Sequence, residues 1–444
     1  MLTIQKARSL HGTLSVPGDK SISHRSIMLG AIAEGDTVVR GFLKSADCLA
    51  TLECFRRLGV SIEEVPASVS ADPKEPSEEA ALIIHGVGLH GLHAPDGVEL
   101  NAENSGTTVR LLSGILAGQS FSSHITGDSS LQKRPMARII RPLTEMGILV
   151  ASNNDDNRLP LRIAGGVPRG IRYTSPVASA QVKSCVLLAG LYAEDPTFFT
   201  EPALSRNHTE LMLGAFGGNL KIRKSRDSEA VTTILYPGTV LTGQNIIVPG
   251  DISSAAYFLA AGLLVRNSEV TLRNVGINET RDGMLRVIRA MGGQMTLSNV
   301  HMEGKEPVAD ITVSSSRLHG TEIGGALIPT LIDELPVIAV MAAAAEGKTV
   351  IRDAGELRVK ESDRLAAIAE NLRKMGIRVD ESEDGMVIYG GTLSGAAVDP
   401  LGDHRLAMAF SVAGLISQTP TTILDETCVN ISYPNFYGDL ALLS

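Results

Sequence analysis

The sequence predicts an α/β protein of two domains, each built from three units that combine a buried helix, an outer helix and several short strands. A chain of 444 residues is too long for one ordinary hydrophobic core. It also repeats itself: Val16-Pro17-Gly18-Asp19 and Val248-Pro249-Gly250-Asp251 each precede an apolar helix, and 33–40 resembles 345–352. Internal repeats of this kind indicate a fold made of duplicated units.

The buried helices are predicted from Gly/Ala-rich segments that start with polar residues and are then apolar nearly all round. A helix without a polar face must lie inside its domain. In the first of them, Pro17 and Gly18 break the preceding strand, and Ser21 or Ser23 can cap the helix. The segments begin near Ser21, Thr107, Ser179, Ser253, Asp333 and His404.

The outer helices are predicted from six amphipathic segments, five of which end in an apolar residue followed by Gly. Gly is the expected residue just beyond a helix C-terminus, and a strand-like run follows it in these segments. The sixth amphipathic segment lies around 435–443. The five ends are Leu58-Gly59, Met146-Gly147, Phe216-Gly217, Met291-Gly292 and Met375-Gly376.

The domain boundaries follow from this order of units. Units one to three form a domain of residues 19–246, and units four to six form a domain of residues 247–444. Residues 1–18 are expected to join the second domain and to supply an extra strand. Solvated loops or hairpin tips are expected at 66–79, 153–157, 224–229 and 302–306.

Composition excludes several classes of protein. A formal net charge of −9 argues against a nucleic-acid binder or a basic membrane-surface protein. No apolar run approaches the length that spans a bilayer, and residues 1–6 lack the apolar core of a signal peptide. The four cysteines are scattered without a CxxC pair, which predicts buried, reduced thiols in a cytoplasmic protein.

The chemistry gathers at the starts of the buried helices. A helix N-terminus presents unpaired N–H groups and the positive end of its dipole, which suits a phosphate or a carboxylate. If these N-termini face one cleft, they converge on anions, and cations at 133–134 and 358–364 add to them. This arrangement suits two phosphorylated or carboxylated small molecules.

Each feature alone also has an ordinary structural explanation. Asp333-Glu334 is normal charge placement at a helix start, and Glu361 with Arg364 is a routine i, i+3 ion pair. The segments 206–210 and 278–281 could hold loop salt bridges, and Cys185 is expected in the core rather than as a nucleophile.

Five colinear motifs closely resemble the 5-enolpyruvylshikimate-3-phosphate (EPSP) synthase family, and the resemblance covers essentially the whole chain. It implies two inside-out α/β domains, each of three βαβαββ-like repeats around buried parallel helices, that close over the substrates. The motifs are Pro17-Gly18-Asp19-Lys20-Ser21, Asn104-Ser105-Gly106-Thr107, Arg134-Pro135-Met136, Arg358-Val359-Lys360-Glu361-Ser362-Asp363-Arg364 and Asp403-His404-Arg405.

The resemblance implies a reaction as well as a fold. The enolpyruvyl group of phosphoenolpyruvate passes to the 5-hydroxyl of shikimate-3-phosphate with release of phosphate, and no metal or organic cofactor takes part. A cytoplasmic monomer that binds neither nucleic acid nor membrane is expected. Addition followed by elimination requires one proton to leave the hydroxyl and another to reach the methylene carbon of phosphoenolpyruvate.

The resemblance also implies roles for individual residues. Asp333 is the expected general base and Glu361 the expected proton donor or shuttle, with Lys20 and His404 completing the catalytic group. The shikimate-3-phosphate contacts carry over to Lys20, Ser21, Arg25, Ser179, Ala180, Gln181, Arg206, Asp333 and Lys360. The phosphoenolpyruvate contacts carry over to Lys20, Asn104, Gly106, Arg134, Gln181, Glu361, Arg364, His404 and Arg405.

Two departures from the family pattern affect these expectations. Ile431 stands where many members have Lys, so one cation at the phosphoenolpyruvate site is expected to be missing. The segments 179–183, 206–210 and 278–281 resemble a subgroup often tolerant of glyphosate, yet Gly106 stands where tolerant members typically have Ala. The sequence is therefore compatible with either a glyphosate-sensitive or a glyphosate-tolerant enzyme.

Three other functions are possible for a chain with these features. The related UDP-N-acetylglucosamine enolpyruvyl transferases have Lys-Asn where this chain has Lys20-Ser21, and they usually carry a reactive loop Cys, which is missing near Arg134. RNA-end-processing proteins and catalytically inactive anion-binding modules can use the same repeat. The net charge of −9 and the lack of a basic stripe with aromatic residues disfavour RNA.

Overall fold

The computed structural model describes residues 1–67, 80–153 and 156–444 and divides the chain into two compact units. One, here called the N-terminal unit, comprises Gly18–Val248 together with Glu303–Lys305. The other, the C-terminal unit, comprises Met1–Pro17, Pro249–Met302 and Glu306–Ser444. Parts of the loops predicted at 66–79 and 153–157 lie outside the described residues.

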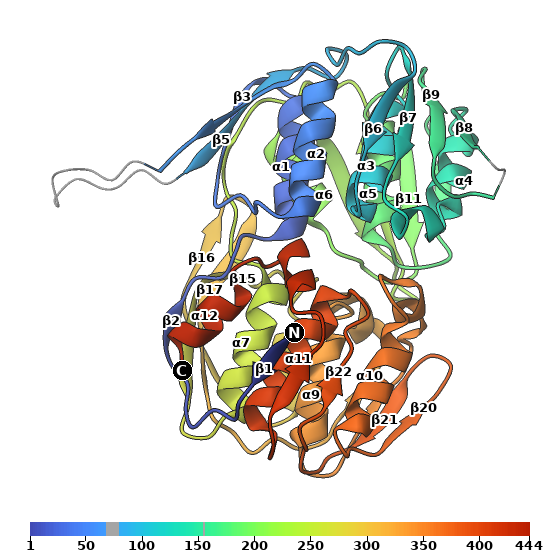
Figure 1. The fold of residues 1–444 in the computed structure, drawn as a ribbon. Coiled ribbons are helices and arrows are strands. Elements are labelled where there is room, and N and C mark those ends of the chain that lie inside the picture. The colour runs from blue at the N-terminus through green and yellow to red at the C-terminus, as the bar shows by residue number, and fades with distance from the viewer. Residues whose placement is uncertain (68–79, 154–155) are drawn as a thin grey trace, which may run out of the picture. The chain divides into compact units, whose positions relative to one another are not determined.

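The N-terminal unit repeats the order helix, strand, helix, strand, strand (Figure 1). Its helices are α1 (Lys20–Ala31), α2 (Ala46–Arg57), α3 (Gly106–Leu116), α4 (Ala137–Glu145), α5 (Ala180–Gly190), α6 (His208–Ala215) and the short 3-10 helix η1 (Leu131–Lys133). Its strands are β3 (Glu34–Arg40), β4 (Ser61–Val65), β5 (Ala81–Val87), β6 (Val98–Asn101), β7 (Ser122–Thr126), β8 (Leu149–Ser152), β9 (Leu161–Ala164), β10 (Arg172–Thr174), β11 (Thr197–Glu201), β12 (Asn219–Lys224), β13 (Val231–Tyr236) and β14 (Asn245–Ile247).

The C-terminal unit follows the same order in its first two repeats, and its third repeat ends with the second helix. Its helices are α7 (Ile252–Leu264), α8 (Gly283–Ala290), α9 (Leu335–Ala344), α10 (Arg364–Lys374), α11 (His404–Ile416), α12 (Phe436–Leu442) and the 3-10 helices η2 (Gly325–Thr330), η3 (Gly355–Val359) and η4 (Thr427–Ile431). Its strands are β1 (Leu2–Ile4), β2 (His11–Leu14), β15 (Glu269–Gly276), β16 (Gln294–Glu303), β17 (Glu306–Ser314), β18 (Glu322–Ile323), β19 (Lys348–Ile351), β20 (Val379–Glu381), β21 (Met386–Tyr389), β22 (Ala397–Val398) and β23 (Thr421–Ile423).

Small mixed sheets enclose the buried helices of each unit. Within the described residues, the strands form five four-stranded sheets and one three-stranded sheet. In the order β6-β7-β9-β8, for example, β6 and β7 are parallel with Val98 opposite Ser123, and the other pairs are antiparallel. Segments distant in sequence complete two sheets, because β14 pairs in parallel with β3 and β2 pairs in parallel with β15.

The buried helices form the centre of each unit, which confirms the predicted α/β fold. Every residue of α7 from Ile252 to Leu263 is buried, and α9 and α11 are buried along almost their whole length. Figure 1 shows α7, α9 and α11 next to one another in the C-terminal unit, and they contact each other. The outer helix α10 is amphipathic, with exposed charges at Glu370 and Lys374.

Local sequence signals placed most helix ends correctly. Each of the five predicted C-terminal glycines, Gly59, Gly147, Gly217, Gly292 and Gly376, has the positive φ angle that glycine adopts without strain. The sixth outer helix is α12, and the tips at 224–229 and 302–306 join β12 to β13 and β16 to β17.

The predicted N-cap of the first buried helix was wrong. Asp19, not Ser21 or Ser23, caps α1, because its Oδ1 accepts a hydrogen bond from the Ile22 amide at 2.9 Å. The Ser23 hydroxyl instead accepts from the Leu43 amide at 3.1 Å. Asp333 also lies one residue ahead of the N-cap of α9, which is Glu334.

Two further expectations concern the whole chain. Cys48, Cys54, Cys185 and Cys428 are buried and free of disulfides, as predicted. No helix in the described part of the chain has the length and apolarity needed to cross a membrane.

Candidate active site

In the N-terminal unit, Lys20 stands at the first turn of α1 and pairs with an acidic residue of α2. Its Nζ donates a hydrogen bond to Oδ2 of Asp47 at 3.0 Å, and both side chains remain partly accessible. The pairing holds an ammonium group at the positive end of the α1 dipole, where an anion is favoured. Asp47 was not predicted from the sequence.

Arg25 lies one turn further along α1 and is buried among hydroxyl groups from two other helices. Its Nε donates to Oγ1 of Thr209 at 2.7 Å, and its Nη2 donates to Oγ of Ser184 at 2.8 Å. Its Nη1 donates to the carbonyl of Ser21 at 2.9 Å. The guanidinium is therefore fixed by α1, α5 and α6 together.

Residues at the start of α3 bring three predicted phosphoenolpyruvate contacts together. Arg134 Nη2 donates to Oδ1 of Asn104 at 2.7 Å, and Asn104 Nδ2 donates to Oδ2 of Asp128 at 2.6 Å. A methyl group built on Gly106 would lie 3.7 Å from Nη1 of Arg134. The start of α3 thus brings together Asn104, Gly106 and Arg134.

Gln181 contacts the same residues through Arg110, which was not among the predicted substrate contacts. Arg110 Nη1 donates to Oε1 of Gln181 at 2.9 Å, and Gln181 Nε2 donates to Oγ1 of Thr107 at 3.1 Å. The N-termini of α3 and α5 are thereby linked by side chains. Its position could have been inferred from the sequence, because Arg110 lies one turn after Gly106 on the predicted helix.

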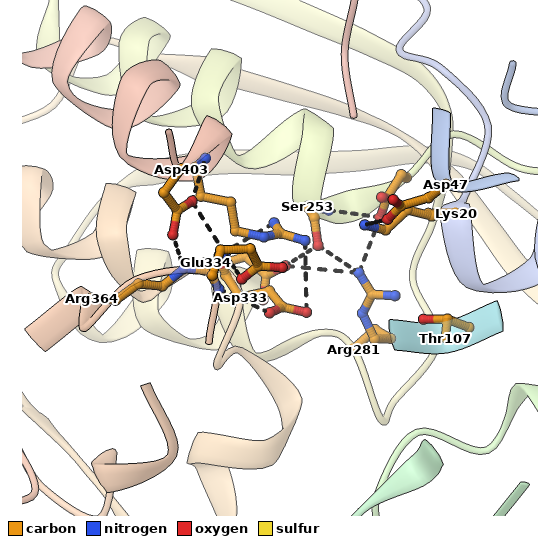
Figure 2. A network of polar contacts seen from close by, with 12 residues as sticks. Lys20, Asp47, Thr107, Ser253, Arg281, Asp333, Glu334, Arg364 and Asp403 are labelled. Atoms are coloured by element: carbon orange, nitrogen blue, oxygen red, sulfur yellow. Dashed lines mark hydrogen bonds and ion pairs between the residues drawn. The ribbon is translucent and has the colours of Figure 1, made fainter. Parts of the chain in front are cut away.

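In the C-terminal unit, Arg364 is the central cation of the site. It is 1% exposed, and its Nε and Nη2 donate to Oδ2 and Oδ1 of Asp403 at 2.7 and 3.2 Å. Nη2 also donates to Oε2 of Glu361 at 2.6 Å, and Nη1 lies 3.5 Å from Oδ1 of Asp333. Figure 2 shows Arg364 beside Asp403 and Asp333.

These contacts determine the charge states of Arg364 and Asp403, which are both buried. Burial alone would lower the pKa of Arg364, but the carboxylates of Asp403 and Glu361 outweigh burial and raise it above its ordinary value. Burial alone would raise the pKa of Asp403, but the charge of Arg364 outweighs it and the pKa is lowered. Both groups are therefore charged at neutral pH.

Arg405 supplies a second guanidinium to Asp333. Its Nη1 donates to the Asp333 carbonyl at 3.3 Å, and its Nη2 lies 3.7 Å from Oδ2 of the same residue. Burial would lower the pKa of Arg405, and the Asp333 carboxylate raises it well above its ordinary value. The Asp333 and Glu361 side chains are 15% and 25% exposed, so both remain accessible to a bound molecule.

A third buried arginine of this unit, Arg281, supports the starts of α7 and α9. Its Nη2 donates to Oδ1 of Asp251 at 3.0 Å and to the Ser253 hydroxyl at 2.7 Å. The Ser253 hydroxyl donates to Glu334, whose Oε1 lies 3.8 Å from Arg281 (Figure 2). Through Arg281, the segment 278–281 thus takes part in a buried ion-pair network.

The remaining predicted residues lie at or near the ends of helices. Ser179 is the N-cap of α5 and accepts from the Val182 amide, and Ala180 follows it. Lys360 is half-buried directly after η3, His404 is buried at the first position of α11, and Arg206 is half-buried ahead of α6. Ile431 packs against the core of the C-terminal unit.

Comparisons with known proteins agree over the full length of the chain. The model of the family "EPSP synthase (3-phosphoshikimate 1-carboxyvinyltransferase)" matches residues 4–440. The 3-phosphoshikimate 1-carboxyvinyltransferases of Thermoanaerobacter sp. (strain X514) and Brevibacillus brevis are 50% and 48% identical, and each alignment covers 100% of both chains. The structure of EPSP synthase from Acinetobacter baumannii superposes with a TM-score of 0.85 at 44% identity, covering 100% of this chain and 98% of that one.

The repeated βαβαββ units and the charged starts of their buried helices define an enolpyruvyl transferase. More narrowly, the chain belongs to the EPSP synthase (3-phosphoshikimate 1-carboxyvinyltransferase) family. It is therefore an enzyme of the shikimate pathway, as the sequence motifs predicted.

Proposed function

We propose that the chain transfers the enolpyruvyl group of phosphoenolpyruvate to the 5-hydroxyl of shikimate-3-phosphate, in a cleft between two domains of residues 19–246 and 1–18 with 247–444. The assignment of roles to individual residues rests on the contacts that the Arg364 guanidinium makes. One buried guanidinium contacts Asp333, Glu361 and Asp403, so two accessible carboxylates share a single positive centre. The reaction moves one proton from the hydroxyl and another to the methylene carbon, and two carboxylates can divide these transfers.

Asp333 takes the proton from the 5-hydroxyl in this proposal. Two guanidinium groups, from Arg364 and Arg405, lie within 4 Å of its two carboxylate oxygens and fix their direction. As the hydroxyl oxygen bonds to the central carbon of phosphoenolpyruvate, Glu361 delivers a proton to the methylene carbon. Elimination then breaks the bond from that carbon to the phosphate oxygen while the Glu361 carboxylate takes back a methyl proton, which forms the enol ether of the product. The proton held by Asp333 leaves with the departing phosphate, so both carboxylates return to their starting state.

Cations stabilise the negative charge of phosphoenolpyruvate and of the departing phosphate. In this proposal phosphoenolpyruvate is bound by four cations, Lys20, Arg134, Arg364 and Arg405. Its site is completed by Asn104, Gly106, Gln181 and His404. Lys20, Ser21, Arg25, Ser179, Ala180, Gln181, Arg206, Asp333 and Lys360 bind shikimate-3-phosphate. Support comes from the pairing of Arg134 with Asn104 beside Gly106, and from the fixed orientation of Arg25. Fixed charges cost no reorganisation when the transition state forms.

The packing of Ile431 against the core supports a site in which Lys20 and the arginines carry the cationic charge without a lysine at position 431. We also infer that the protein is a cytoplasmic monomer, and its four free, buried cysteines support the cytoplasmic location.

Phosphate release tests the proposal. Purified protein with phosphoenolpyruvate should release phosphate when shikimate-3-phosphate is added and should not when UDP-N-acetylglucosamine is added instead. The organic product should carry the enolpyruvyl group on the 5-oxygen, which nuclear magnetic resonance identifies. Phosphate release with UDP-N-acetylglucosamine but not with shikimate-3-phosphate would instead assign the chain the reaction of the UDP-N-acetylglucosamine enolpyruvyl transferases.

A further inference from the structure

A buried ion-pair cluster lies on α5 and α6, the two helices whose hydroxyl groups contact Arg25. The cluster has no role in the reaction described above. Lys183 Nζ lies 2.7 Å from Oε1 of Glu201 and 2.8 Å from Oε1 of Glu210, and it donates to the Ser205 carbonyl at 3.2 Å. The three side chains, here called the Lys183 cluster, are at most 2% exposed. Such a cluster is costly to desolvate and is weak support for stability as such.

The cluster joins three elements of the N-terminal unit. Lys183 lies in the first turn of α5, Glu201 ends β11, and Glu210 lies in the first turn of α6. Oε1 of Glu201 also accepts from the Ser205 amide at 3.2 Å. The segment between β11 and α6, which contains Arg206, is therefore fixed at Ser205 from both its amide and its carbonyl.

The same helices supply the two hydroxyl groups that hold Arg25. Ser184 follows Lys183 on α5, and Thr209 precedes Glu210 on α6. Their hydroxyl oxygens lie 2.6 Å apart, and each accepts one hydrogen bond from the Arg25 guanidinium. The spacing between α5 and α6 therefore determines where the guanidinium of Arg25 is held.

We propose that the Lys183 cluster and the hydroxyls of Ser184 and Thr209 are positioning residues for shikimate-3-phosphate, which act by fixing Arg25 and the segment that carries Arg206. The proposal rests on the proposed function, since it takes Arg25 and Arg206 as contacts of that substrate. It also gives a physical role to two sequence segments, 179–183 and 206–210, whose residues Lys183 and Glu210 contact each other.

Two pairs of variants separate positioning from packing. Thr209→Val keeps the shape of the side chain but loses the acceptor for Arg25, so the dissociation constant for shikimate-3-phosphate should rise about tenfold. Thr209→Ser keeps the hydroxyl and loses a methyl group, and it should bind within about twofold of wild type. If Thr209 served only packing, the order of the two variants would be reversed.

Glu210→Leu frees α6 from Lys183 but leaves the Lys183–Glu201 pair intact, so no buried charge is left without a partner. It should weaken shikimate-3-phosphate binding about tenfold, while Glu210→Gln, which retains an acceptor for Lys183, should stay within about threefold. The Michaelis constant for phosphoenolpyruvate should change little. Cys185→Ala on α5 controls for destabilisation alone, because Cys185 is buried on the same helix and belongs to neither the cluster nor the hydroxyl pair.

Calorimetric titration with shikimate-3-phosphate measures each dissociation constant, and circular dichroism confirms folding. Wild-type affinity in folded Thr209→Val and Glu210→Leu would overturn the proposal, as would equal losses in Thr209→Ser and Thr209→Val. A wild-type protein that does not bind shikimate-3-phosphate would instead contradict the proposed function.

Discussion

Arg364 and Asp403 form a two-point ion pair in the C-terminal unit, with Nε 2.7 Å from Oδ2 and Nη2 3.2 Å from Oδ1. Both side chains are at most 1% exposed. Asp403 is also the N-cap of α11, where its Oδ1 accepts from the Arg405 amide at 2.9 Å. One carboxylate thus orients the guanidinium that contacts Asp333 and Glu361, and it also sets the start of the helix that carries Arg405.

Removing the charge of Asp403 should therefore destabilise the protein strongly. Asp403→Asn leaves Arg364 without its closest buried counter-ion, and we expect a loss of about 3 kcal/mol in the free energy of unfolding. Urea denaturation measures it. Asp363→Asn is the matched control, because Asp363 caps α10 and pairs with Arg358 but is 43% exposed. The control should lose about 1 kcal/mol or less. Asparagine caps a helix about as well as aspartate, so equal losses in the two variants would contradict a large contribution from the buried Arg364–Asp403 pair.

Gly106→Ala should disturb phosphoenolpyruvate binding through Arg110. The new methyl carbon would lie 2.6 Å from Nη1 of Arg110, so this guanidinium must move and release Gln181. Gly106 does not have a positive φ angle, so alanine fits the backbone there, and its retention for dihedral reasons alone is not supported.

We expect the Michaelis constant for phosphoenolpyruvate to rise roughly tenfold and the inhibition constant for the longer glyphosate to rise further. Steady-state kinetics on the purified variant measures both constants. Gly166→Ala is the control, because its methyl group would meet only Ile148 at 3.8 Å. Equal shifts in the two constants, or no shift, would remove Gly106 from the proposed binding residues.

His24 should make stability depend on pH. Burial lowers its pKa to about 3, although the nearby Asp47 opposes the shift, and Nδ1 lies 2.7 Å from Oγ1 of Thr51. Below pH 6.5 the unfolded chain binds a proton that the folded chain does not. The contribution of His24 is therefore complete above that pH and falls by about 1.4 kcal/mol per unit as the pH drops toward 3.

His24→Gln removes this titration. Urea denaturation at pH 7, 6 and 5 should show the free energy of unfolding falling less steeply with acid in the variant than in wild type. Parallel pH dependences of the two proteins would contradict the role given to His24.

The repeat structure was predictable because its signals are local. Gly59 and Gly376 mark helix ends within a few residues, and the apolar composition of 252–264 alone requires burial. The N-cap of α1 was missed because Asp19, Ser21 and Ser23 are all good caps, and only the course of the backbone selects between them.

The contacts that orient the site were less predictable, because they join residues far apart in the chain. Arg25 and Thr209 are 184 positions apart, and Lys20 and Asp47 belong to different helices. The family motifs supplied the residues expected to touch the substrates. They did not supply Arg110, Asp47 or the Lys183 cluster, whose roles depend on the packing of α1, α2, α3, α5, α6 and β11.

The most direct measurement of the central claim is the turnover number of Asp333→Asn with phosphoenolpyruvate and shikimate-3-phosphate. Asparagine keeps the shape of the side chain but cannot accept the hydroxyl proton, so turnover should fall by roughly 10²–10⁴-fold while shikimate-3-phosphate affinity changes far less. Glu361→Gln, measured in parallel, reports on the second carboxylate that contacts Arg364. Near wild-type turnover in a folded Asp333→Asn protein would contradict the assignment of Asp333 as the base.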